Sequence, residues 1–162
     1  MSTKPSSDQL AKAEELINFA QIFGTSIFDV LMSKYPPLEK IGKQYGEWIY
    51  LVSIACVGSA FMSMCNDLPE NDQRAMPYAI QDELVKWREK SYDHLCDFLQ
   101  YHDDYTETSD NKAPEAIGSW IIKCLSTSPD SDLSVNKLDE FTSIYEPIGM
   151  LIIKEFLFYW RK

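Results

Sequence analysis

Residues 48–65 read WIYLVSIACVGSAFMSMC, and none of them carries a formal charge. A helix that is apolar on all sides lies either in a protein core or in a membrane. This stretch is at the short limit for crossing about 30 Å of hydrocarbon, and it contains three serines. The other predicted helices are amphipathic and need a central partner on which to bury their apolar sides. We therefore expect a buried central helix, with a membrane-associated helical protein as the second alternative function.

The rest of the chain predicts an all-α fold. Its 162 residues are typical of a single domain, here 1–162. Turn pairs such as Asn-Gly and the alternation of a half-buried strand are nearly absent. We expect a bundle of five to six helices around the apolar helix at about 46–65. Residues 1–6 are expected to be disordered.

The first helix is predicted from Ser7 to Lys34. Ser6 and Gln9 have the spacing of a capping box, in which each side chain bonds the other residue's backbone. Tyr35 is followed by two prolines, which disfavour helix at that residue. Apolar and small residues recur at spacings of three and four, which predicts one core-facing side. These residues are Leu10, Ala13, Leu16, Ile17, Phe19, Ala20, Phe23, Gly24, Ile27, Val30 and Leu31.

Three more helices are predicted downstream of the apolar helix. They run from about Pro77 to Tyr101, from Pro114 to Leu125 and from near Ser134 to the end, separated by polar segments at 67–77, 102–113 and 126–132. Pro77 is placed at the first helical position, where its missing N–H has no cost. Pro147 is expected to kink or split the last helix.

Charge is concentrated in the middle of the chain. The net charge is −10, and residues 66–110 contain 12 acidic and 4 basic residues, which accounts for eight of the ten excess negative charges. Free nucleic acid is a poor partner for such a surface, because its phosphates require clustered Lys and Arg. A basic protein surface is a better one, because opposite potentials speed association. Solubility alone is the other reading of the acidic surface.

We therefore predict a non-catalytic, cytoplasmic protein that binds another, basic protein through an acidic face. Immunity proteins, inhibitors and assembly subunits are the classes that fit. No direct nucleic-acid contact and no membrane contact are expected. The predicted partner-binding residues are Asp82, Glu89, Asp93, Asp97, Asp103 and Asp104, together with Glu83, Tyr101, Tyr105 and Trp160.

The cysteines favour a reducing compartment without a metal site. Cys56, Cys65, Cys96 and Cys124 are widely spaced and form no CxxC pair, so paired zinc ligands are not visible. The first ten residues contain no apolar stretch, so we expect no secretory signal and a cytoplasmic location. No cofactor and no catalytic residue are predicted.

The alternative function is a metal-dependent hydrolase. His94 and His102 lie eight residues apart among several aspartates, which on one helix directs the two rings within about 80° of each other. The His102-Asp103 pair resembles the doublet of the HD-type metallophosphohydrolases, which are all-helical. The resemblance covers these two residues, and it implies a phosphohydrolase-like site using His94, His102 and Asp103.

The end of the chain, MLIIKEFLFYWRK (150–162), is strongly apolar. With the α-helical period, Ile148, Leu151, Ile152, Phe156 and Tyr159 share one side of this helix. A second set of residues lies on another side of the helix and would be exposed in a simple bundle: Ile153, Leu157 and Trp160. The helix is therefore either buried on most sides or part of an interface, for which a homodimer through this helix is one arrangement.

Overall fold

The computed structural model describes residues 4–35, 45–67, 70–108, 110–127 and 142–160; for residues 45, 64–67, 71–72, 110 and 159–160 it describes the backbone alone. Within these ranges every regular element is helical, which confirms the all-α fold class. In chain order the elements are α1 (Ser7–Lys34), α2 (Tyr45–Asp67), α3 (Glu70–Trp87), α4 (Ser91–Thr106), the 3-10 turn η2 (Asp110–Lys112), α5 (Ala113–Ser126), α6 (Thr142–Leu151), the π-helical turn η4 (Ile152–Phe156) and α7 (Leu157–Trp160).

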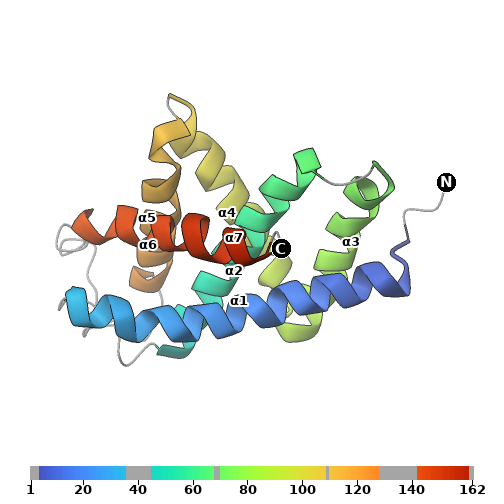
Figure 1. The fold of residues 1–162 in the computed structure, drawn as a ribbon, viewed down its shortest axis with the longest axis horizontal. Coiled ribbons are helices and arrows are strands. Elements are labelled where there is room, and N and C mark those ends of the chain that lie inside the picture. The colour runs from blue at the N-terminus through green and yellow to red at the C-terminus, as the bar shows by residue number, and fades with distance from the viewer. Residues whose placement is uncertain (1–3, 36–44, 68–69, 109, 128–141, 161–162) are drawn as a thin grey trace.

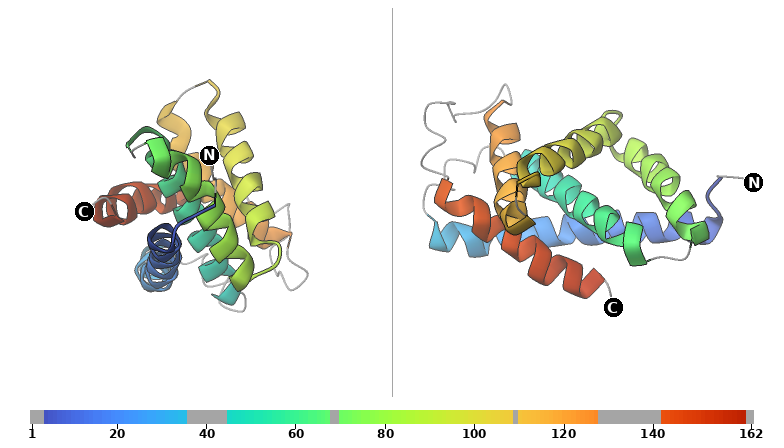
Figure 2. Two further views of the ribbon diagram at one scale, coloured as in Figure 1. Left: turned by 90° about the vertical axis from the view of Figure 1, so that its right-hand side faces the viewer. Right: turned by 90° about the horizontal axis from the view of Figure 1, so that it is seen from above.

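Helix α2 lies at the centre of the bundle (Figures 1 and 2). Every residue from Tyr50 to Ala60 is buried, and the helix packs against α1, α3, α4, α5, η4 and α7. The indole Nε1 of Trp48 donates a hydrogen bond to the Gly24 carbonyl of α1 at 3.1 Å. The absence of a side chain at Gly24 lets the two helices approach closely. The prediction of a buried central helix is confirmed.

Two described helical stretches, Ser7–Lys34 and Gly46–Ser63, are long and apolar enough to cross a membrane by length and composition. The core helix of a soluble protein meets the same criteria. In the most apolar 18-residue part of each helix, 67% is buried inside the fold for Gly46–Ser63 and 44% for Ser7–Lys34. These two helices therefore do not establish a location for the protein.

Helix α1 has the predicted bounds and the predicted capping box. The backbone N–H of Gln9 donates to Ser6 Oγ at 3.2 Å, and the Ser6 N–H donates to Gln9 Oε1 at 2.8 Å. Disorder was predicted for residues 1–6; residues 1–3 lie outside the described residues, while residues 4–6 are described and Ser6 caps α1. Val30 was predicted in the core-facing side, but half of its side chain is exposed. Successive residues are rotated by about 100° around the helix. Val30 therefore lies at the edge of the buried side of α1, whose middle is close to Leu31.

The predicted third helix, Pro77 to Tyr101, is wrong in its bounds, because two helices occupy this region. Helix α3 begins at Glu70 and includes Pro77 in its interior, and the chain turns before Ser91 to start α4, which continues to Thr106. The hydroxyl of Ser91 donates to the carbonyls of Leu84 and Arg88 at 2.5 and 2.7 Å. The same two carbonyls also accept from the backbone N–H groups of Arg88 and Ser91, each at 3.1 Å, so the Ser91 hydroxyl adds to the backbone hydrogen bonds of this turn.

Helix α5 agrees with its predicted bounds to one residue at each end, and it crosses α6 closely. A Cβ atom added at Gly118 would overlap the Tyr145 carbonyl, and one added at Gly149 would overlap the Pro114 carbonyl. Each glycine thus contacts the backbone of the other helix. Pro147 lies inside α6, while the predicted start of the last helix near Ser134 falls outside the described residues.

The π-helical turn η4 changes which side chains of the last helix reach the core. The Leu157 N–H donates to the Ile152 carbonyl, five residues earlier instead of four. The extra residue keeps Ile148, Ile152 and Phe156 buried and brings Leu157 to 9% exposure. Leu157 was expected to be exposed only in a simple bundle, and its burial fits the alternative in which this helix is buried on most sides. Ile153 is partly buried.

Candidate functional site

Helix α4 carries a face of carboxylates and contains neither Lys nor Arg. Asp93, Asp97, Asp103 and Asp104 are all exposed, while Ser91, Leu95 and Phe98 on the other side of the helix are buried. We call these four aspartates the α4 acidic face. Helix α4 lies on the side of α2 opposite α1 (Figure 2). The sequence predicted Asp103 and Asp104 in the polar segment 102–113, and this is wrong, because α4 continues to Thr106.

Some acids outside the α4 acidic face are paired with bases, while exposed Glu107 forms no ion pair among the described residues. The described pairs are Glu70 with Arg74 at 2.5 Å, Glu83 with Lys86 at 2.7 Å, and Glu47 with Arg88 at 3.0 Å. Within the described ranges, Asp82, Glu89 and the α4 acidic face form no ion pair. The Glu83 side chain is only 11% exposed. Glu83 therefore stabilises α3 locally, and it contributes less to the open acidic surface than the sequence suggested.

Asp97 also has an internal role that sequence reasoning missed. The indole Nε1 of the buried Trp120, on α5, donates to Asp97 Oδ2 at 3.0 Å. Burial, followed by the charge of Asp97, raises the pKa of the nearby Cys124 thiol to about 12. Asp97 thus joins α4 to α5 with one carboxylate oxygen. A buried indole N–H needs such an acceptor, but the sequence does not show which acid supplies it.

Tyr101 and Tyr105 lie between α4 and α5 with both hydroxyls bonded. The Tyr101 hydroxyl bonds Ser119 Oγ at 2.6 Å and accepts from Lys123 Nζ at 2.9 Å. Burial, followed by the charge and hydrogen bond of Glu115, raises the pKa of Tyr105 to about 12. The two rings stack with centroids 5.8 Å apart. Both tyrosines were predicted to bind a partner, and in this structure they join α4 to α5.

His94 contacts the central helix. Its Nδ1 lies 2.5 Å from the Tyr50 hydroxyl, and the Arg88 guanidinium lies 3.9 Å above the Tyr50 ring. Burial is the main cause that raises the pKa of Tyr50 to about 12, and Arg88 opposes it. The direction of the hydrogen bond between the Tyr50 hydroxyl and His94 Nδ1 depends on the tautomer of the imidazole. His94 therefore holds α4 against α2.

The three residues of the hydrolase alternative do not gather at one point. The His102 ring lies 6.1 Å from that of Phe98, and eight residues of helix separate His94 from His102 by about 12 Å. Within the described part of the chain, no three His, Cys, Asp or Glu side chains are placed to hold a metal ion. Asp103 is exposed. The side chain of Trp160, another predicted site residue, lies outside the described part.

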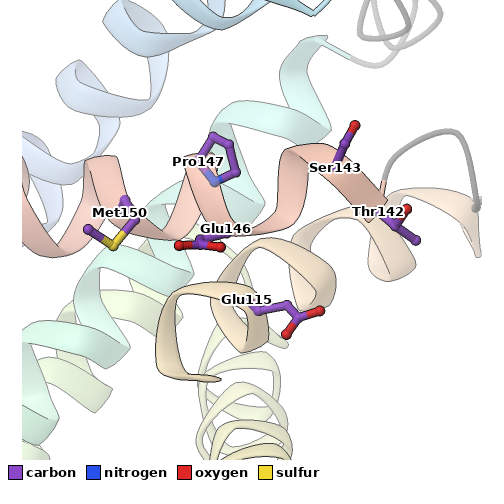
Figure 3. Close-up of a pocket in the computed structure, with 6 residues that line it drawn as sticks. All are labelled: Glu115, Thr142, Ser143, Glu146, Pro147 and Met150. Carbon is purple, nitrogen blue, oxygen red and sulfur yellow. The ribbon is translucent and has the colours of Figure 1, made fainter. Parts of the chain in front are cut away.

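A pocket of about 380 Å³ lies between α5 and α6 (Figure 3). Its lining combines carboxylates, hydroxyls and apolar groups: Glu115, Thr142, Ser143, Glu146, Pro147 and Met150. Glu115 also bonds Tyr105, which connects this pocket to α4. No sequence motif predicted the pocket, because its residues come from two helices that are joined by a long connection.

Comparison of the chain with protein-family models, with curated proteins and with solved structures gave no match.

Proposed function

We propose that this chain is a non-catalytic, cytoplasmic protein that binds a basic protein through Asp82, Glu89 and the α4 acidic face. Its class is that of immunity proteins, inhibitors and assembly subunits. The observation that carries this proposal is a group of six exposed carboxylates, on α3, on the turn after it and on α4, that form no ion pair among the described residues.

The position of two of these acids supports the same proposal. Asp103 and Asp104 lie in the last turn of α4, which contains no base. The C-terminal end of a helix carries partial negative charge, so an acid there costs roughly 0.3–1 kcal/mol. The two aspartates also repel each other as neighbours. A basic partner would offset both costs, because it brings positive charge to this end of the helix.

The test is affinity for the natural partner, captured from the native organism, as a function of salt. We expect affinity to fall as salt rises, since exposed charges are screened over about 10 Å at 0.1 M. Asp103→Lys should weaken binding by about ten-fold or more. The same variant should be as stable as the wild type or more stable by roughly 0.3–1 kcal/mol, because it removes an unfavourable charge from the helix end.

The matched control is Asp29→Lys, which makes the same charge change at an exposed position on α1. It should change affinity by less than about two-fold, since mutations of exposed charges outside an interface have small effects. Binding that is independent of salt, or equally weakened by both substitutions, would contradict the proposal.

A further inference from the structure

The outward side of α3 exposes apolar side chains. Tyr78, Asp82 and Val85 follow at i, i+4 and i+7 and therefore share one helix face. Tyr78 is 47% exposed and Val85 is 44% exposed. Large apolar residues with this degree of exposure are few in the described part of the chain, and two of them lie together on this face. Grouped exposed apolar residues mark interaction sites more often than single ones do.

Tyr92, in the first turns of α4, extends this face across the helical hairpin that α3 and α4 form (Figure 2). Its hydroxyl bonds the Cys96 thiol and lies near Tyr78. Burial is the first cause that raises the pKa of Tyr92, followed by the charge and hydrogen bond of Cys96 and then by Tyr78. We call the exposed Tyr78 and Val85, together with the half-buried Tyr92 near Tyr78, the hairpin patch.

Acids outnumber bases around the hairpin patch. Asp82 lies between its two α3 residues, and Asp93 follows Tyr92 on α4. In the turn that joins the helices, Glu89 lies between Lys90 and Arg88, which is bound to Glu47 at 3.0 Å. On α4, Cys96 and Asp103 are four and eleven residues beyond Tyr92, which places them on the same side of the helix. The nearest base on α3, Lys86, is bound to Glu83 at 2.7 Å. Apolar contact and negative charge are therefore combined on one surface.

We propose that the hairpin patch and its surrounding acids receive an amphipathic basic helix of the partner protein. Apolar side chains of that helix would contact Tyr78, Val85 and Tyr92, while its Lys and Arg side chains would face Asp82, Glu89 and the α4 acidic face. This inference rests on the proposed function and adds the apolar part of the contact. Helix-in-groove recognition by apolar anchors at i, i+3, i+4 and i+7 uses the same arrangement.

The negative charge near the hairpin patch favours an amphipathic basic helix over the other molecules that bind apolar surfaces. A second copy of this chain would bring the same carboxylates to the contact, and like charges across an interface repel. Anionic lipid and nucleic acid carry the wrong sign for the same reason. A uniformly basic surface without apolar residues would leave the tyrosines and Val85 without contacts. A helix with one apolar side and one basic side satisfies both parts.

The probes are two synthetic peptides of Leu and Lys with identical composition and ~18 residues, about five helical turns. In one, the leucines fall on a single helix face; in the other, they are shuffled. We expect the amphipathic peptide to bind at least about ten-fold more tightly, because one or two apolar anchors contribute about 1.4 kcal/mol or more. Calorimetry at fixed salt measures both affinities.

The key variant is Val85→Asn, with Val30→Asn as its matched control. Val30 is 50% exposed on α1, so the same substitution there removes a similar apolar side chain from a different surface. Val85→Asn should reduce the preference for the amphipathic peptide to less than about three-fold and leave the salt dependence unchanged. Val30→Asn should retain the preference. Circular dichroism checks that both variants have the wild-type helix content.

The outcomes separate this inference from the proposed function. Equal affinity for the two peptides, or a preference that Val85→Asn leaves intact, overturns the hairpin patch as a docking surface and leaves electrostatic binding in place. Self-association that Val85→Asn abolishes assigns the surface to a second copy and also overturns the inference. If Asp103→Lys changes neither peptide's affinity, the electrostatic proposal itself fails.

Discussion

At the scale of single residues, Ser91 lies at the boundary between α3 and α4, which the local sequence does not indicate. Neither Gly nor Pro lies between Trp87 and Ser91, so the α-helical pattern continues through the turn. The Ser91 side chain is fully buried, and its hydroxyl contacts the carbonyls of Leu84 and Arg88. A serine hydroxyl can bond nearby backbone carbonyls in this way, here in addition to their backbone donors. The break between α3 and α4 is therefore a property of the folded molecule.

Ser91→Ala should lower the free energy of unfolding by about 0.5–1.5 kcal/mol, because it removes a buried side-chain hydrogen bond while the carbonyls of Leu84 and Arg88 keep their backbone donors. The matched control is Ser33→Ala, which removes an exposed bond from Ser33 Oγ to the Val30 carbonyl and should cost less than about 0.5 kcal/mol. Urea unfolding measures both. Equal effects of the two substitutions would show that the Ser91 bonds do not stabilise the turn.

At the scale of elements, the sequence predicted best where local chemistry decides the outcome. The bounds of α1 follow from Ser6, Gln9 and the prolines after Tyr35, and α5 follows from its apolar period and Pro114. The hairpin of α3 and α4 and the π-helical turn η4 were not predicted, because contacts between helices determine them. The same holds for the bond from Trp120 to Asp97, since it joins residues on two helices.

The crossing of α5 and α6 depends on its two glycines. Gly118→Ala and Gly149→Ala should each lower the free energy of unfolding by about 3 kcal/mol or more, because the added Cβ meets a backbone carbonyl that cannot move aside. Gly46→Ala is the control: a Cβ there meets nothing within 4 Å. It should be neutral or stabilising by up to about 1 kcal/mol. Thermal unfolding of all three variants distinguishes crowding from a general effect of glycine replacement.

At the scale of the whole molecule, the sequence predicted the distribution of charge and apolarity better than the contacts of the site. The uncharged stretch is the central helix, and the four α4 aspartates are exposed together. The hairpin patch was not predicted, because Tyr78 and Tyr92 come together only once α3 turns into α4. Tyr101 and Tyr105 were assigned to the surface for a related reason: the sequence does not show that α5 supplies partners for their hydroxyls.

Stability should decrease in alkali between about pH 10 and pH 12. Tyr50 and Tyr105 have folded-state pKa values of about 12, against an ordinary value of 10.0. The folded chain therefore keeps protons that the unfolded chain releases. Their contribution is fully present below pH 10 and is lost as the pH rises through 12. Urea unfolding across this range should show a shallower decline for the double variant Tyr50→Phe, Tyr105→Phe; an unchanged slope would contradict this prediction.

The π-helical turn η4 allows the last helix to lose one residue and still keep its packing. A helix normally tolerates no single-residue deletion, because everything beyond it rotates by about 100°. Here the turn already holds one residue more than an α-helix needs, so losing exposed Lys154 or Glu155 would regularise the backbone. Ile148, Ile152 and Phe156 would keep their orientation, as would Leu157. A version of this segment that is one residue shorter is thus compatible with the same packing.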